Sequence, residues 1–137
     1  MKIECLVNGY VLPNLLYELI FLDEHEVNID VQDWHDERVV DEMIGTYILP
    51  RFVSFNPDTK IVVRNTLRYL LATKDDASEI WDAIWEASSA PIPTPHGIRH
   101  FFKQCHDTLF DNELLPSNDE LVNYHVNHDM HIANRLN

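Results

Sequence analysis

The sequence predicts a mostly α fold, a compact helical bundle of about five to six helices in which residues 1–137 form a single globular domain. Three observations support this prediction. Hydrophobic residues make up 45% of the 137 residues, which is enough to build one buried core. Only three glycines occur, which is few for a turn-dense β-sandwich. Apolar residues recur at spacings of three and four along most of the chain, as on one face of an amphipathic helix.

The first 32 residues have the least regular pattern. Residues 3–7 and 10–12 flank Asn8-Gly9, a pair that suits the type I′ turn of a β-hairpin. Residues 15–20 favour a helix, whereas apolar and polar residues alternate over 27–32, as in a half-buried strand. These segments predict a small N-terminal β element (α+β), with a purely helical bundle as the alternative.

Capping residues mark the starts of the later helices. Asn56-Pro57 and Thr94-Pro95 each place a capping side chain before a proline, which has no N–H to leave unpaired at the first helical position. Ser117, with a glutamate three residues later, fits a capping box. Further caps are predicted at position 33 or 36 and at 75, with a weaker start at 14. The apolar stripes are Val39, Val40, Met43, Ile44, Tyr47 and Ile48; Val63, Leu67, Leu70 and Leu71; Ala77, Ile80, Trp81, Ile84 and Trp85; Ile98, Phe101, Phe102, Cys105 and Leu109; and Leu121 or Val122, Val126, Ile132 or Ala133, and Leu136.

The negative charge is concentrated in one part of the chain. The formal net charge is -13, and residues 18–42 contain ten acids against one base, Arg38. Such acidity argues against nonspecific nucleic-acid binding and against docking on anionic membranes, since both need a basic surface. The block has two interpretations: a solvated face that limits aggregation, or a docking surface for a basic partner. In the second, the partner-binding residues are Asp30, Asp33, Trp34, Asp36, Glu37, Asp41 and Glu42.

Trp34 itself allows two roles. An aromatic side chain among carboxylates is typical of an interface hot spot. A tryptophan that closes the junction into the following helix is equally compatible with the sequence.

The basic residues that follow have an explanation within the fold. Lys60, Arg64 and Arg68 form one helix face, and the next helix presents Glu79, Asp82 and Glu86. We expect the two helices to be antiparallel neighbours joined by an exposed ion-pair seam, which would contribute little stability.

A histidine-rich segment gives the only metal-ligand pattern. On a helix, His125, His128 and Asp129 would share one face and could chelate a divalent metal. The segment lacks the H-E-x-x-H arrangement, and we expect neither a metal nor another cofactor to be required. A nucleophile pattern, a phosphate-binding loop and a dinucleotide fingerprint are also absent, so no catalytic residue is assigned.

The expected compartment follows from the N-terminus and the cysteines. The start of the chain does not resemble a signal peptide, and no segment is apolar enough to span a bilayer. We therefore expect a cytoplasmic protein in which Cys5 and Cys105 are thiols, with a disulfide as the alternative if the fold brings them together.

In size, acidity and lack of a catalytic motif, the chain resembles the immunity proteins of bacterial toxin systems such as contact-dependent growth inhibition and colicins. No sequence motif carries this resemblance. It implies a non-enzymatic inhibitor that occludes a basic nuclease toxin. Two alternatives stay open: a metal-dependent hydrolase that uses the histidine cluster, and a nucleic-acid mimic of the anti-CRISPR or anti-restriction type.

Overall fold

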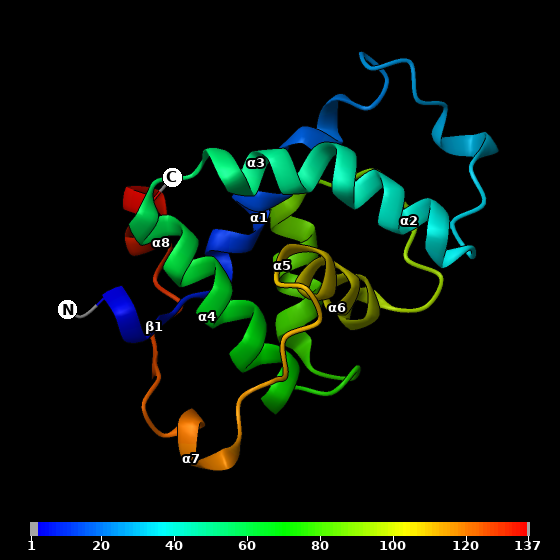
Figure 1. Ribbon diagram of the computed structural model, residues 1–137. Helices are drawn as coiled ribbons and strands as arrows, with labels where there is room; N and C mark the ends of the chain where they lie inside the picture. Colours follow the sequence, from blue (N-terminus) through cyan, green and yellow to red (C-terminus); the bar gives the residue numbers. More distant parts are fainter. Residues whose placement is uncertain (1–2, 137) are drawn as a thin grey trace.

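Helices dominate the structure, a computed structural model that describes residues 3–136 (Figure 1). The predicted mostly helical fold with a small β element is confirmed. The predicted domain spans residues 1–137, of which 1–2 and 137 lie outside the described residues. The α-helices are α1 (Leu12–Leu15), α2 (Glu37–Met43), α3 (Leu49–Ser54), α4 (Pro57–Thr73), α5 (Glu79–Ser88), α6 (Ile98–Leu109), α7 (Asn118–Leu121) and α8 (Met130–Leu136). The strands are β1 (Leu6–Val7) and β2 (His125–Val126), and short 3₁₀ helices cover Ile3–Cys5, Gly9–Val11, Tyr17–Phe21 and Ile29–Val31.

The predicted N-terminal hairpin is wrong. β1 pairs in parallel with β2 from the far end of the chain, with Leu6 opposite His125. Asn8 does not form a hairpin turn, because its side-chain oxygen accepts a hydrogen bond from the Tyr10 N–H (2.9 Å) and so caps the 3₁₀ helix that leads into α1. Gly9 serves close packing, since a Cβ at this position would lie 3.0 Å from Ile84 Cδ1.

The predicted strand over 27–32 is also wrong. Asn28 accepts a hydrogen bond from the Asp30 N–H (3.1 Å) and caps the 3₁₀ helix Ile29–Val31. Val27 and Ile29 pack against the core, whereas Val31 is 71% exposed. The alternation of apolar residues therefore arises from two side chains, Val27 and Ile29, that contact the core from a segment that is not a strand.

One helical rod runs from α2 through a π-helical stretch, Ile44–Ile48, into α3 (Figure 1). Asp36 caps its start, as predicted. The π-helical stretch has a local cause, because Pro50 lacks an N–H and its ring cannot pack against the carbonyl four residues earlier. The backbone widens instead, and the Leu49 N–H bonds the Ile44 carbonyl.

The caps of the remaining helices agree with the sequence only in part. Asn56 caps α4 by accepting from the Thr59 N–H (2.9 Å), and Ser117 caps α7, both as predicted. The predicted start of α6 at Thr94-Pro95 is wrong, because the helix begins after Gly97, whose φ of 97° is a conformation that favours glycine. α5 begins after Ser78, whereas Asp75 forms a turn with the Ala77 N–H. Likewise, α1 begins at Leu12, before position 14.

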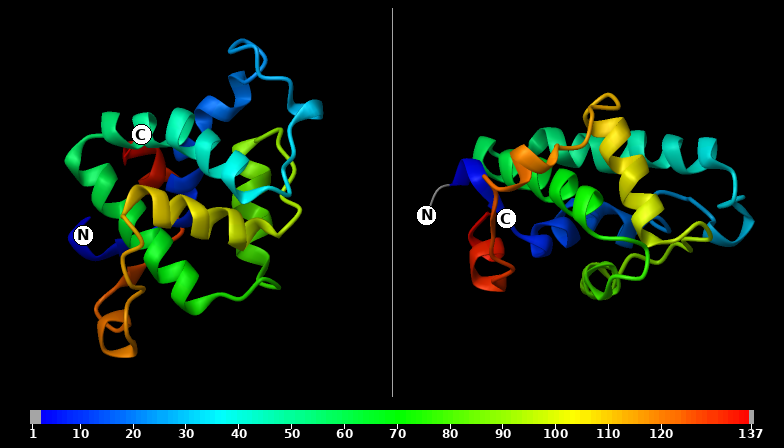
Figure 2. Two further views of the ribbon diagram at one scale, coloured as in Figure 1. Left: turned by 45° about the vertical axis from the view of Figure 1, so that its right-hand side comes forward. Right: turned by 90° about the horizontal axis from the view of Figure 1, so that it is seen from below.

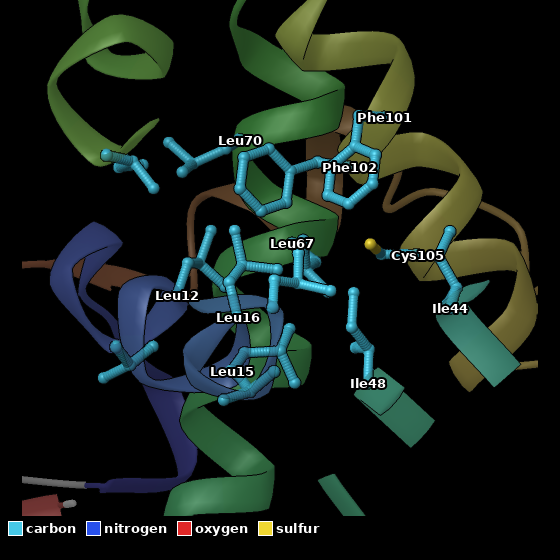
Figure 3. Packing of buried hydrophobic residues seen from close by; sticks show 14 of the residues in the cluster. Leu12, Leu15, Leu16, Ile44, Ile48, Leu67, Leu70, Phe101, Phe102 and Cys105 are labelled. Carbon is cyan, nitrogen blue, oxygen red and sulfur yellow. The ribbon is translucent and has the colours of Figure 1, made fainter. Parts of the chain in front are cut away.

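A single hydrophobic cluster joins the elements. Side chains from α1, the rod, α4 and α6 converge in Figure 3, where the Cys105 sulfur points toward Leu67 and Phe102. Trp81 of α5 stacks on Phe102 at a centroid distance of 5.7 Å. The cluster includes residues from every predicted apolar stripe, although the last stripe contributes only Ala133 and Leu136 while Val122 and Val126 are exposed, so the predicted core is largely confirmed.

The predicted ion-pair seam between α4 and α5 is wrong. α5 packs mainly against α1 and α6, because its apolar face carries Trp81 and Trp85, whose rings meet the phenylalanines of α6. Two residues of the basic face of α4 contact residues 113–124 instead, and Arg64 donates to Glu113 Oε2 at 3.1 Å. Arg68, whose side chain is 9% exposed, donates to the Leu114 carbonyl and to the Tyr124 hydroxyl, both at 3.0 Å.

Candidate binding surface

The acidic part of the chain forms a projecting loop and one face of the rod. We call residues 22–36 the acidic loop; it lies at the edge of the molecule, beyond the start of α2, in Figures 1 and 2. The Val27 N–H donates to the Leu22 carbonyl (3.0 Å), and Val27 and Ile29 pack on the core. The loop is therefore attached through apolar contacts while its carboxylates face outward.

Trp34 holds the loop from inside. Its side chain is 6% exposed, and its indole N–H donates to the Ile29 carbonyl at 2.9 Å. Of the two roles that the sequence allowed, the structure supports the core residue at the junction with α2. A partner can meet at most the edge of this ring, so Trp34 is not a protruding hot-spot anchor.

Three of the predicted partner-binding acids contact the protein itself. Asp36 caps α2 and accepts from the Arg38 Nε (3.3 Å) and Nη2 (3.1 Å), and these hydrogen bonds hold the pKa of its carboxyl below the ordinary value. Glu37 Oε1 lies 2.5 Å from His100 Nε2, and Asp41 accepts from Gln104 Nε2 at 3.0 Å. The contacts of Glu37 and Asp41 join α2 to α6.

The remaining acids of the predicted set have no ion-pair partner in the part of the chain that the structure describes. Asp30 and Asp33 are exposed on the loop and Glu42 on α2, and none makes an ion pair among residues 3–136. Three further exposed acids, which were left out of the predicted set, share this state: Asp23, Glu24 and Glu26. Glu37 and Asp41 could not be recognised as paired from the sequence, because their partners on α6 lie more than sixty positions away, whereas the partner of Asp36 is only two positions away.

A shallow groove of about 330 Å³ runs between the acidic loop and α2. Trp34, Val39 and Met43 contribute apolar surface to it, and Glu26 and Glu42 are among the residues that line it. The acidic surface is therefore not a flat field of charge, since it encloses a partly apolar hollow.

Histidines border the acidic surface on the α6 side. His96 Nε2 lies 2.9 Å from the His35 carbonyl oxygen, and the His96 ring packs near those of His35 (5.8 Å) and His100 (5.3 Å). This grouping could not be predicted from the sequence, because His35 belongs to the loop, His96 precedes α6 and His100 lies in the first turn of α6. The contacts fix the second end of the loop.

The predicted helical histidine face is wrong. The predicted helix is interrupted between α7 and α8, and His125 lies in β2. His128 Nδ1 accepts a hydrogen bond from the Gly9 N–H (2.9 Å), so one of its two ligand nitrogens already has a partner. Burial, with a smaller effect from Lys74, lowers the pKa of His128 below its ordinary value. No group of three or more histidine, cysteine or acidic side chains within residues 3–136 is arranged to hold a metal ion.

The two cysteines are free thiols, as the first interpretation predicted. Cys105 is completely buried, and burial raises the pKa of its thiol far above the ordinary value. A buried thiol with a raised pKa is a core residue, which agrees with its place in the apolar stripe of α6.

Comparison with protein-family models, curated proteins and solved structures finds no match to this chain. Across the described part of the chain, no helix is both long and apolar enough to cross a membrane.

Proposed function

We propose that the chain is a non-catalytic binding protein that captures a basic protein on the acidic loop and the adjoining face of α2. One observation carries the proposal: six exposed carboxylates, Asp23, Glu24, Glu26, Asp30, Asp33 and Glu42, have no ion-pair partner across residues 3–136. Their mutual repulsion opposes folding. A bound cationic surface would remove that repulsion.

The acidic loop is attached to the rest of the protein in a way that favours binding of a partner. The hydrogen bond from Val27 to Leu22 holds one end of the acidic loop, and the contact between His35 and His96 holds the other. Trp34 bonds Ile29 between them, so little ordering is left for the moment of binding. Exposed charges mainly raise the association rate through electrostatic steering. The exposed Val31, between Asp30 and Asp33, adds the apolar contact that an interface needs near its charges.

The partner we favour is a nuclease toxin, with this chain as its cytoplasmic immunity protein. A nuclease needs a basic surface to hold nucleic-acid phosphates. Carboxylates placed over that surface would block substrate without any chemistry at the active site. In bacterial competition, a cell that produces such a toxin would protect itself by blocking the toxin's nucleic-acid-binding surface in this way.

A capture experiment with two matched variants tests the proposal. Asp30→Asn/Asp33→Asn/Glu42→Gln removes three unpaired charges from the acidic surface. Glu79→Gln/Asp82→Asn/Glu86→Gln removes three exposed charges from α5, where they make no ion pair within residues 3–136. Both variants therefore change the net charge equally, and only the position differs.

The immobilised wild-type chain and both variants are incubated with extract of the native host at low salt, and bound proteins are identified by mass spectrometry. We expect a basic nuclease on the wild type and the α5 variant but not on the loop variant, and inhibition of that nuclease by the purified chain. Equal capture by both variants would contradict docking on the loop. Capture of a DNA-binding enzyme from which DNA displaces the chain would replace the immunity role by nucleic-acid mimicry.

A further inference from the structure

We propose that the groove beside Trp34 binds one arginine side chain of the partner protein. This proposal rests on the function proposed above and specifies how the acidic surface selects its partner. Its basis is that one groove has both an apolar lining and carboxylates. Negative charge alone would attract any basic group, whereas this combination selects a side chain with an apolar stem and a cationic end.

The groove has room for one long side chain and for water beside it, since its volume is about 330 Å³. The groove lies between the acidic loop and α2, and the loop side is fixed by the hydrogen bond from Trp34 to Ile29. It therefore does not have to open before it is filled.

The lining matches the two halves of an arginine side chain. Val39, Met43 and the accessible edge of Trp34 offer apolar surface to the methylene stem. Glu26 and Glu42 offer carboxylate oxygens to the guanidinium, whose five N–H donors form a planar fork that suits such acceptors. Gln32 and Thr46, which also line the groove, add neutral acceptors for the remaining donors.

Other occupants fit less well. An acidic side chain would face two carboxylates, and a purely apolar one would leave both of them without a partner. A lysine has a compact charge with three donors and cannot bridge as many acceptors. The larger hollow near Tyr17, of about 540 Å³, does not share this chemistry, because its charged group is Arg51, which already donates to the Asn14 carbonyl at 3.1 Å.

An NMR titration with a small probe tests the groove without any partner. The probe is N-acetyl-arginine methylamide, and its neutral counterpart is the corresponding citrulline compound, which has nearly the same shape. The signals followed are the Trp34 indole N–H and the Met43 methyl group. The variants are Glu26→Gln/Glu42→Gln for the groove and Glu79→Gln/Glu86→Gln for α5, which lose equal charge.

We expect saturable shifts of both signals with the arginine probe and none with the citrulline probe. The groove variant should bind the arginine probe about fivefold to tenfold more weakly, since two partly exposed ion pairs are lost, while the α5 variant should bind as the wild type does. Equal shifts with both probes, or unchanged binding to the groove variant, would overturn the proposal. The groove variant keeps its apolar lining, so we expect it to fold. Its NMR spectrum without probe, compared with that of the wild type, verifies this.

The outcome is separable from that of the capture experiment. If the loop captures a basic nuclease but the arginine probe leaves Trp34 and Met43 unshifted, the arginine pocket is wrong and the binding function stands. If the probe binds as expected and no basic protein is captured, the pocket stands and the proposed function fails.

Discussion

Replacing Trp34 by alanine should destabilise the whole domain, because this side chain attaches the acidic loop to the core. The side chain is 6% exposed, so its removal costs both the transfer free energy of a large aromatic group and the cavity that remains. Truncations of this kind lower the free energy of unfolding by about 3 to 5 kcal/mol. Trp34→Phe keeps most of the apolar surface but leaves the Ile29 carbonyl without its donor, for which we expect about 1 to 2 kcal/mol.

Urea unfolding followed by far-ultraviolet circular dichroism measures both values, since the helical backbone dominates this signal in the wild type and in the variants. The control is Val31→Ala on the same loop, where the 71% exposed side chain predicts a change within about 0.5 kcal/mol. Limited proteolysis within residues 22–36 should become faster in Trp34→Ala and stay unchanged in Val31→Ala. A loss below about 1 kcal/mol for Trp34→Ala would refute its role as the internal anchor of the loop.

Three further predictions concern other parts of the molecule. Arg68→Met should lower the free energy of unfolding by about 2 to 3 kcal/mol, because it leaves the Leu114 carbonyl and the Tyr124 hydroxyl without this donor and Glu120 without its nearby cation; an equal loss in exposed Lys74→Met would argue against this. His128 has a lowered pKa in the folded state, so the unfolded chain binds more protons at mildly acidic pH. The contribution of neutral His128 to the stability of the fold should therefore be complete above the pKa of the unfolded chain and be lost as the pH falls through the pKa of the folded state. Denaturation at several values from about pH 7.5 to about pH 5.5 should show this loss in wild type and in His125→Gln but less of it in His128→Gln. A thiol reagent should label Cys5 in the native protein and reach Cys105 only after denaturation, as followed by mass spectrometry; rapid native labelling of Cys105 would contradict its burial.

The helical core was predictable because its signals are local. The apolar spacing from Val39 to Ile48 gave the buried face of the rod, and Asn56-Pro57 gave the start of α4. Each of these signals depends on residues within one or two turns of one another. In these helices the tertiary contacts agree with the local preferences of the sequence.

The chain ends and junctions were not predictable for the opposite reason. β1 acquires its strand conformation from a partner more than one hundred residues later, and the final segment breaks at β2 to supply that partner. Asn8-Gly9 satisfies a hairpin pattern, but the Asn8 side chain bonds the backbone of Tyr10 and the carbonyl of Asp129 instead. Patterns over a few residues do not contain these pairings.

The candidate surface was predicted in its position but not in its composition. Acid content identified residues 18–42, yet it could not distinguish Glu37, held by His100, from Glu42, which makes no ion pair among residues 3–136. It also ranked Trp34 as an exposed anchor and an internal one equally, since burial of that ring depends on how residues 27–34 fold back. Only the three-dimensional contacts separate structural carboxylates from those that a partner could use.

The most direct test of the binding role is the salt dependence of affinity for the captured basic partner, measured by titration calorimetry. We predict that the affinity of the wild-type chain falls steeply as salt rises, because exposed charges separated by more than a Debye length of about 10 Å at 0.1 M are largely screened. Asp30→Asn/Asp33→Asn/Glu42→Gln should bind more weakly at low salt and show a shallower dependence, whereas the α5 variant Glu79→Gln/Asp82→Asn/Glu86→Gln should match the wild type. An affinity that does not change with salt, or the same curve for both variants, would contradict binding through the acidic loop.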